Sequence, residues 1–257
     1  MTAAILRYEC FNALRSKWLY AYTSLLTTTI FGLAYLAADI RRTELVLISV
    51  LILLVPLVSM LFTTAYWYGS ELFTELLVAQ PVSRRSIFWA RIISIVASLT
   101  TCLAIALFVP TVTLFGFDRS LVWLFLGMAL AGAVFCCLGT LVATYVIDRL
   151  WGIGLGLAIW FYFIAVHDGL LLLLLYWFRE YPLDHLGAGA CAFNALSIVR
   201  VGLLLYFDAP LLLGHAGALV SGLAEGKMVV PIFFGLIGGW LVIPLVFAQR
   251  RFARRDF

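Results

Sequence analysis

Long uninterrupted blocks of apolar residues are the feature that most limits what this chain can fold into. A block of about 20 apolar residues matches one helical crossing of the hydrocarbon core of a bilayer. Lipid offers the backbone no hydrogen-bond partners, so a spanning segment must be a helix or part of a closed barrel, and the short alternating strands of a barrel are not seen. The blocks cover residues 18–38, 45–66, 87–116, 121–147, 151–178 and 229–248. The sequence therefore predicts an all-α integral membrane protein with about six transmembrane helices.

The small number of charged residues supports the same conclusion. Hydrophobic residues make up 65% of the 257 residues and charged residues 12%. An ordinary soluble domain has roughly 45–50% apolar and 25% charged residues. So few charges cannot cover a surface that faces water. Because the sequence shows no internal repeat and no low-complexity tract, we expect a single transmembrane domain over residues 1–257.

Lys and Arg are unevenly distributed between the two sides of the predicted membrane domain. With six spans both termini share one side, which would carry eleven of these residues against three in the opposite short loops. Cytoplasmic loops are enriched in Lys and Arg, so both termini are predicted to be cytoplasmic. The eleven are Arg7, Arg15, Lys17, Arg84, Arg85, Arg91, Arg149, Arg250, Arg251, Arg254 and Arg255, and the three are Arg41, Arg42 and Arg119.

A long segment between the fifth and sixth spans, residues 179–228, is predicted to be extracytoplasmic. It is not a polar linker, because it contains apolar runs at 203–207 and 211–213. Pro182, Pro210 and several glycines prevent one continuous helix. We expect this segment to fold back onto the membrane surface or to dip into it.

Residues 1–17 show the spacing of a short amphipathic helix ahead of the first span. Apolar positions recur at i, i+4, i+7 and i+8, with polar residues between them. The apolar side is Leu6, Cys10, Ala13 and Leu14, and the polar side is Glu9, Asn12 and Arg15. Such a helix is expected to lie in the membrane interface. The alternative is an extension of the first span.

The loop of residues 69–86 is predicted to contain a short cytoplasmic helix. Ser70 can cap its start, and Glu71 complements the exposed N–H groups of the first turn. Because the residue before a proline avoids the α region, the helix is expected to end ahead of Pro81. Ser83 can then start the next helix, with Arg84 at its cytoplasmic mouth.

One face of this short helix is predicted to be apolar. A ridge of this kind suits the docking of a soluble partner, and it also suits an interfacial helix that rests on lipid. The sequence does not choose between the two. The predicted ridge is Leu72, Phe73, Leu76 and Leu77, and the opposite face is Glu71, Thr74 and Glu75.

His167 and Asp168 are ionisable residues inside the fifth apolar block. An acid at the centre of a bilayer costs at least roughly 2.5–3.5 kcal/mol, so such residues usually mark function. They are candidates for lining a pathway or relaying protons. The alternative is that they lie near the outer headgroups or pair with another helix of the bundle.

Signatures of catalysis and of cofactor binding are absent from the sequence. Around Gly226-Lys227, a phosphate-binding loop would need Gly at Ser221 and Ser or Thr at Met228, and both requirements fail. No motif of a hydrolase and no spaced Cys/His set for a metal is present. We therefore expect no enzymatic activity, no metal site and no cofactor bound by this chain.

The loop and the two ends of the chain resemble permeases of the type-2 ABC exporter superfamily. The resemblance combines an N-terminal amphipathic helix, six spans, the loop motif, and the ending from Arg251 to Phe257. It covers the whole chain. The loop motif is carried by Gly69, Glu71, Glu75, Leu76, Leu77, Pro81, Val82, Ser83 and Arg84.

Within that superfamily the chain looks most like the NosY branch, which is associated with maturation of the periplasmic copper enzyme nitrous-oxide reductase. Asp168 precedes a Leu-rich run, and residues 193–200 resemble a segment of that branch. Asn194 and Arg200 match its pattern, and both are assigned with His167 and Asp168 to the pathway. The chain departs from the pattern at Ala195 and Ser197, where the branch has a proline and an acid.

The resemblance implies a set of partners. The chain would form a homodimer in a bacterial inner membrane and bind two copies of a separate cytoplasmic ATPase, which would hold MgATP. The NosY branch adds a periplasmic partner resembling the β-helical NosD, and delivery of a sulfur species or copper-site component. The lipid bilayer is a further expected partner, and no nucleic acid is expected.

Three functions compete at this point. The leading one is the permease subunit of an ATP-driven transporter, in which the helix near residues 70–80 receives the movement of the ATPase. The second is a proton- or ion-coupled carrier or channel that uses His167 and Asp168, although twin inverted halves are not evident. The third, a membrane-embedded enzyme, is disfavoured because no cluster of paired catalytic groups is present.

Overall fold

The computed structural model describes the chain except for residues 1, 38, 79–81, 178–192, 208–228 and 255–257. The regular elements of the described part are all helices, and six of them are long and apolar enough to cross a membrane. The chain is a multi-pass helical membrane protein, as predicted. Pro81 and most of the extracytoplasmic segment 179–228 lie outside the described residues.

From α1 to α8 the helices follow one another along the chain with short connections. Six spans are formed by α2, α3, α5, α6, the continuous α7–η1–α8 rod and α12. The elements are α1 (Thr2–Leu14), α2 (Lys17–Ala37), α3 (Ile40–Gly69), α4 (Glu71–Val78), α5 (Arg84–Phe115), α6 (Arg119–Tyr145), α7 (Arg149–Phe161), the π-helix η1 (Tyr162–Val166), α8 (His167–Trp177), α10 (Ala195–Tyr206) and α12 (Val229–Ala253).

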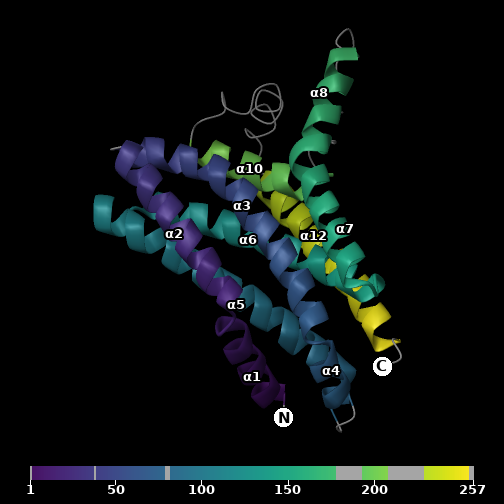
Figure 1. Cartoon of the computed structure of the whole chain (residues 1–257). Coiled ribbons are helices and arrows are strands. Elements are labelled where there is room, and N and C mark those ends of the chain that lie inside the picture. The colour runs from purple at the N-terminus through teal and green to yellow at the C-terminus, as the bar shows by residue number, and fades with distance from the viewer. Residues whose placement is uncertain (1, 38, 79–81, 178–192, 208–228, 255–257) are drawn as a thin grey trace.

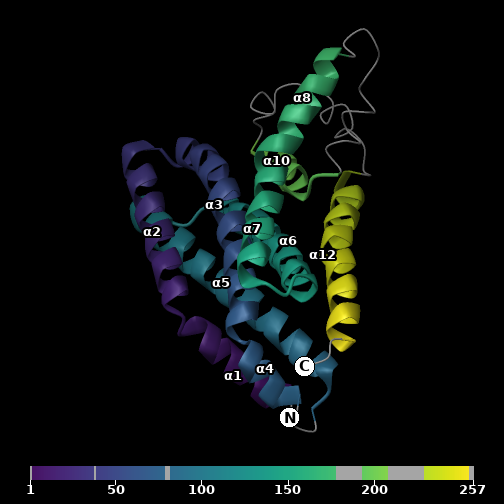
Figure 2. The same ribbon diagram turned by 45° about the vertical axis from the view of Figure 1, so that its right-hand side comes forward.

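The helices α3, α5 and α6 form the centre of the bundle. α3 packs against α6, α2 lies along α5, and α12 lies along α6. α7 packs on α3, while α8 extends beyond the rest of the bundle (Figures 1 and 2). The fully buried side chains between the central helices are large and apolar, among them Leu51, Met60, Phe88 and Phe135.

The bundle has two ends that differ in their elements. We call the end with α1, α4 and the last turn of α12 the basal end, and the end with α8 and α10 the apical end (Figure 2). At the basal end, the Arg84 Nη1 donates to the Ala253 carbonyl at 3.1 Å and so joins α5 to α12. The Tyr68 hydroxyl donates to the Val146 carbonyl at 3.0 Å, which joins α3 to the turn after α6.

Small residues bring α7 close to α3. A Cβ built at Gly152 would lie 1.8 Å from the Tyr68 hydroxyl, and one at Gly156 would lie 3.5 Å from the Met60 side chain. At Gly152 only glycine leaves room for this approach, whereas a Cβ at Gly156 would make an ordinary van der Waals contact. Small residues at such close approaches are common between membrane helices. The Gly152-x-x-x-Gly156 motif therefore packs inside the subunit. A Cβ added at Gly235 or Gly239 would meet no atom within 4 Å, so these two glycines mark no close approach of this kind.

Polar side chains cap three of the spans. The Ser83 hydroxyl accepts from the Ser86 N–H at the start of α5, which confirms the predicted cap. Asp118 accepts from the Ser120 N–H at the start of α6. Asp148 accepts from two amides of the first turn of α7. Gly116, with φ +81°, ends α5 in a conformation that favours glycine.

Candidate functional site

The short helix α4 lies at the basal end between two spans, α3 and α5, as the loop pattern predicted. Thr74 and Leu77 are buried, whereas Glu75 and Leu76 face outward, and the Leu76 side chain is 66% exposed. The prediction of one exposed apolar ridge is therefore wrong. Leu77 points inward together with Thr74, whereas Leu76 lies beside Glu75 on the outer face. The described side chains do not include that of Leu72.

Thr74 faces inward because its hydroxyl both accepts and donates a hydrogen bond there. The hydroxyl accepts a hydrogen bond from the Arg91 Nη1 at 2.8 Å and donates to the Ser70 carbonyl at 2.8 Å. A buried hydroxyl costs little when both its donor and acceptor functions are satisfied. The apolar periodicity alone could not show this, since the partner Arg91 lies one helix further along the chain.

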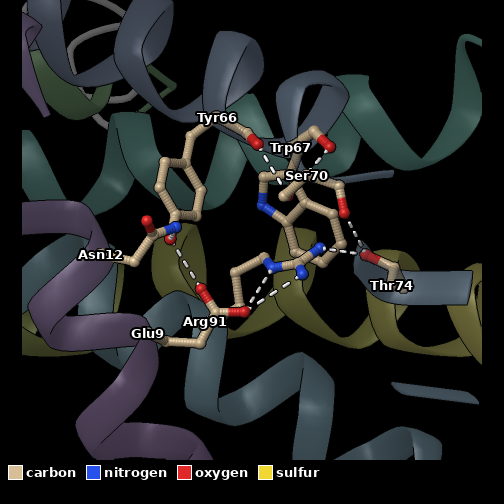
Figure 3. Close-up of polar contacts among 7 residues, drawn as sticks. All are labelled: Glu9, Asn12, Tyr66, Trp67, Ser70, Thr74 and Arg91. Atoms are coloured by element: carbon tan, nitrogen blue, oxygen red, sulfur yellow. Dashed lines mark hydrogen bonds and ion pairs between the residues drawn. The ribbon is translucent and has the colours of Figure 1, made fainter. Parts of the chain in front are cut away.

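A buried ion pair lies beneath α4 (Figure 3). The Arg91 Nη2 lies 3.1 Å from the Glu9 Oε1, and both side chains are only 1% exposed. The Arg91 Nε donates to the same oxygen at 3.3 Å. The guanidinium also lies over the Trp67 ring, 4.9 Å from its centroid, in a cation–π arrangement.

The second oxygen of Glu9 is also occupied. The Tyr66 hydroxyl donates to the Glu9 Oε2 at 2.7 Å and accepts from the Asn12 Nδ2 at 3.1 Å (Figure 3). The carboxylate is therefore held by a cation on one side and a phenol on the other. Beside it, the Tyr8 ring stacks on the Phe73 ring of α4 with centroids 5.0 Å apart.

This arrangement corrects the sequence analysis of the N-terminal helix. α1 forms over nearly the predicted range, but Glu9 points into the bundle instead of toward water. Tyr8 and Phe11 are exposed, and so is Leu14, which was assigned to the apolar side. The reason is electrostatic. Arg91 is buried at the start of α5, and leaving its charge unpaired would cost more free energy than a continuous apolar face on α1 would gain.

The prediction for Ser70 is also wrong. Its hydroxyl donates back to the Tyr66 carbonyl at 2.8 Å and to the Trp67 carbonyl at 3.2 Å, so it completes the end of α3 and does not cap α4. Its own carbonyl is the acceptor for Thr74. The junction between α3 and α4 is thereby held by hydrogen bonds that run across it.

Taken together, these contacts form a basal network, which we define as Glu9, Asn12, Tyr66, Trp67, Ser70, Thr74 and Arg91. It connects α1, α3, α4 and α5 through charge-assisted hydrogen bonds, which are about twice as strong as neutral ones. A displacement of α4 would pull directly on Arg91 of α5 and, through Glu9, on α1. The arrangement is therefore suited to transmit a movement of α4 to α1 and α5.

The network escaped the sequence analysis, although two signals were present. Glu9 is the only acid in residues 1–17, and Arg91 lies inside the predicted span 87–116. Ionisable residues at membrane depth usually have a partner, so an acid and a base without obvious local partners can be expected to pair. Arg91 entered the argument only as one of the basic residues that set orientation.

The predicted pathway residues do come together, at the apical end. The Arg200 Nη1 lies 3.7 Å from the Asp168 Oδ2, and the His167 Nδ1 lies 3.5 Å from the Asp168 Oδ1. The Ser197 hydroxyl donates to the Asp168 Oδ1 at 3.4 Å. The Asp168 and Arg200 side chains are 42% and 45% exposed, whereas His167 is buried.

Asn194 supports this apical cluster, which we define as His167, Asp168, Asn194, Ser197 and Arg200. It is completely buried, its Oδ1 accepts from the amides of Leu196 and Ser197, and its Nδ2 donates to the Phe163 carbonyl at 2.7 Å. Asn194 therefore caps α10 and ties it to the rod.

The carbonyl that Asn194 reaches belongs to the π-helix η1. Here the His167 N–H donates to the Tyr162 carbonyl five residues earlier, so the ordinary helical pattern is interrupted. π-bulges occur frequently at functional sites. The interruption gives α10 a place to attach to the side of the rod, immediately before His167 and Asp168.

A third polar contact was not predicted. The Ser120 hydroxyl donates to the Glu44 Oε1, and Glu44 is completely buried near the start of α3. This contact joins α3 to the first turn of α6. Among the described residues, no group of three or more His, Cys, Asp or Glu is placed to hold a metal ion.

Comparisons with known proteins do not assign the chain to a family: no protein-family model matches the sequence, and no curated protein matches it significantly. The resemblance to type-2 ABC exporters therefore stays a prediction. The features of the chain that bear on its function are its membrane-spanning fold, the basal network and the apical cluster.

Proposed function

We propose that this protein is the membrane-spanning subunit of an ATP-driven transporter and that α4 is the helix on which a separate ATPase docks. The observation that carries the proposal is the contrast between the two faces of α4. Leu76 and Glu75 are exposed to a partner, while Thr74 on the opposite face is bonded to the buried Arg91. A docking helix needs both an open face and a firm attachment to the spans.

Coupling requires that the bound partner favour one arrangement of the spans over another, since a ligand shifts only an equilibrium whose states it binds differently. The basal network meets that requirement, because α4 cannot shift without straining its bonds to α1 and α5. ATP binding and hydrolysis would take place in the partner, which would hold MgATP, so the present chain would carry no enzymatic activity.

The distribution of basic residues supports a cytoplasmic basal end. Of the described Lys and Arg residues, ten lie at or next to the basal ends of the helices and four at or near their apical ends. Cytoplasmic loops carry the excess of such residues. The basal ten are Arg7, Arg15, Lys17, Arg84, Arg85, Arg91, Arg149, Arg250, Arg251 and Arg254, and the apical four are Arg41, Arg42, Arg119 and Arg200.

Orientation is tested by labelling single cysteines with a membrane-impermeant reagent in a variant without the native cysteines. Ser83→Cys lies in the connection after α4, and Phe117→Cys lies in the exposed turn between α5 and α6. We expect labelling of position 117 in sealed cells and of position 83 only after the membrane is broken. Labelling of position 83 from outside would overturn the docking proposal.

The resemblance to the NosY branch supports a finer form of the proposal. In this form two copies of the chain and two ATPase copies assemble in a bacterial inner membrane. A NosD-like periplasmic protein receives a sulfur species or copper-site component for nitrous-oxide reductase. Asp168, Asn194 and Arg200 carry that resemblance and lie together at the apical end, which would face the periplasm.

A proton- or ion-coupled carrier is the second candidate, because His167 and Asp168 are in contact with each other and with Arg200. A relay would need further ionisable groups along the rod. In the described rod from Arg149 to Trp177, His167 and Asp168 are the only such groups of the Asp, Glu, His or Lys type. This favours the ATP-driven transporter.

The docking proposal is tested by isolating the tagged chain from native membranes in mild detergent. We expect an ATPase to co-purify with the wild type and to be lost in Leu76→Glu, because the substitution places a charge on the docking face. Leu150→Glu is the matched control, since Leu150 is also exposed at the basal end but lies on α7. Equal ATPase recovery from the Leu76→Glu and Leu150→Glu proteins would place the docking site elsewhere.

A further inference from the structure

A cavity of about 720 Å³ opens at the basal end beside the basal network. Its walls are the elbow between α1 and α2, the second half of α3 and the first turns of α7. Its lining includes two exposed basic side chains, Arg15 from the elbow and Arg149 from α7, which mark its mouth. It also includes buried apolar side chains such as Leu19 and Phe62, which form its interior. None of the described residues that line it is Asp or Glu.

The depth of this cavity matches one leaflet of a bilayer. Its lining on α3 and the residue that ends this helix runs from Val58 to Ser70, a difference of 12 positions, which is about 18 Å along the helix axis. Half of the hydrocarbon core is about 15 Å thick. The cavity therefore extends from the end of the span to about the depth that an acyl chain of the same leaflet reaches.

The two arginines at the mouth carry uncompensated charge. Both are exposed, and neither forms an ion pair with any described residue. The acids nearby are already engaged: Glu9 is paired with Arg91, and Asp148 accepts from the amides of Leu150 and Trp151. The mouth therefore attracts an anion from outside the subunit.

Two tryptophans indicate that this mouth lies at the level of the lipid headgroups. Trp18 and Trp151 stand in the first turns of α2 and α7, and each is 77% exposed. Tryptophan is enriched where a membrane meets water. Trp18 is itself part of the cavity wall, next to Arg15.

We propose that this cavity is a binding site for one anionic phospholipid. Its phosphate contacts Arg15 and Arg149, and one acyl chain fills the apolar part between Leu19 and Phe62. The volume falls within the roughly 300–1,000 Å³ of small-molecule sites, and the sequence of a charged mouth and an apolar interior matches the two ends of a lipid. The site does not depend on whether an ATPase docks on α4.

Such a lipid would rest against the basal network. Asn12 and Tyr66 line the cavity and are bonded to each other, and Tyr66 holds Glu9. Occupancy would therefore stabilise the position of α1 relative to α3. Removing the lipid would leave these two side chains facing an empty or water-filled space.

Native mass spectrometry of the purified protein tests the proposal, because it resolves bound lipid and oligomeric state together. Delipidated protein is titrated with phosphatidylglycerol, with phosphatidylcholine, and with water-soluble glycerol phosphate. The test variant is Arg15→Ala/Arg149→Ala, and the matched control is Arg85→Ala/Arg250→Ala. The control residues are exposed basal arginines outside the cavity.

We expect one phosphatidylglycerol per chain to bind in preference to phosphatidylcholine. The test variant should bind it on the order of 30-fold more weakly, since each basic residue near an anionic headgroup contributes to the attraction, while the control variant is unchanged. Ala65→Trp, which fills the cavity and keeps both arginines, should also abolish this binding.

Three outcomes would overturn the proposal. In the first, the two arginine variants bind the lipid equally. In the second, glycerol phosphate competes as well as the lipid does, which would show a site for phosphate alone. In the third, Ala65→Trp dissociates a dimer without changing lipid binding, which would show that a second copy of the chain covers the cavity. Thermal unfolding of each variant in detergent checks that it is folded.

Discussion

The two carboxylate–guanidinium pairs of this protein differ in burial and therefore in what they can do. The Arg91 Nη2 lies 3.1 Å from the Glu9 Oε1, and each side chain is 1% exposed. Arg91 and the Tyr66 hydroxyl both donate hydrogen bonds to the Glu9 carboxylate. Asp168 and Arg200 are 3.7 Å apart and nearly half exposed. The first pair is built as a fixed connection between helices. The second is open to solvent or to a ligand and can exchange partners at little cost.

Burial decides the energetic consequences of losing one member of a pair. Removing one partner of a buried pair leaves an unpaired charge and costs about 3–5 kcal/mol. An exposed pair contributes about 0.2–1 kcal/mol. The contrast predicts an order of effects, in which substitutions in the buried basal pair destabilise the fold and substitutions in the exposed apical pair change its stability little.

The largest effect is expected from Arg91→Met, which keeps the length of the side chain and removes its charge. The free energy of unfolding should fall by about 3–5 kcal/mol because Glu9 is left buried and unpaired. Unfolding of the purified protein in a denaturing detergent measures it. Arg85→Met, an exposed position on the same helix, is the control.

The double variant Glu9→Gln/Arg91→Met sharpens this result. Removing both charges leaves no unpaired ion, so much of the stability lost in Arg91→Met should return. If Arg91→Met is as stable as Arg85→Met, the basal pair is not the fixed connection described above.

The second effect concerns Asn194, which attaches α10 to the rod. Asn194→Ala should cost about 1–3 kcal/mol, because the Phe163 carbonyl and the first amides of α10 lose a buried partner. Asn194→Asp keeps the acceptor for those amides but removes the donor. Hydrogen exchange at Leu196 and Ser197 should therefore accelerate in the Ala variant and much less in the Asp variant. Equal exchange in both variants would show that the cap is unimportant.

A smaller effect is expected at the apical pair. Arg200→Ala should change the free energy of unfolding by no more than about 1 kcal/mol. The change should shrink further between 0.1 M and 1 M salt, as the Debye length falls from about 10 Å to 3 Å, whereas the effect of Arg91→Met should hardly respond to salt. A large, salt-independent loss in Arg200→Ala would show that the two pairs are alike.

The smallest effect is a dependence on pH at Asp118. The Ser120 N–H at the start of α6 donates to this carboxylate and lowers its pKa below the usual 3.8. A group with a lowered pKa stabilises the fold above its usual pKa, and this contribution is lost as the pH falls from there through the lowered value. Asp118→Asn should remove this loss while keeping a cap. Unfolding curves of the wild type and of Asp118→Asn, measured from about pH 6 to about pH 3 in steps of about one unit, would show the difference. The same dependence of stability on pH in both proteins would contradict the assignment.

The sequence predicted the spans because hydrophobic length is a local property. The six predicted blocks became α2, α3, α5, α6, the rod and α12, and the pattern at 69–86 became α4. Caps that depend on adjacent residues followed too, as Ser83 shows. These features need only neighbouring residues and the hydrogen-bonding demands of the backbone.

The direction in which individual side chains point, and the pairs between residues distant in the sequence, could not be predicted from local patterns. Glu9 and Arg91 are 82 positions apart, and Thr74 turns inward only because Arg91 is there. The apolar periodicity placed Glu9 and Thr74 on solvent-facing sides of their helices. It could not show that the buried Arg91 donates hydrogen bonds to both of them. The apical cluster was partly predicted, since His167 and Asp168 are conspicuous inside an apolar block and the resemblance pointed to Asn194 and Arg200.

The central claim is that α4 couples an ATPase to these spans, and it is tested most directly by MgATP hydrolysis in vesicles reconstituted with the tagged complex. The account predicts hydrolysis that co-purifies with the wild type, persists in Asp168→Asn and Leu150→Glu, and is lost in Leu76→Glu. Two results would contradict it. One is undiminished hydrolysis in Leu76→Glu. The other is a proton flux that an imposed pH gradient drives without MgATP and that Asp168→Asn abolishes, which would identify a carrier.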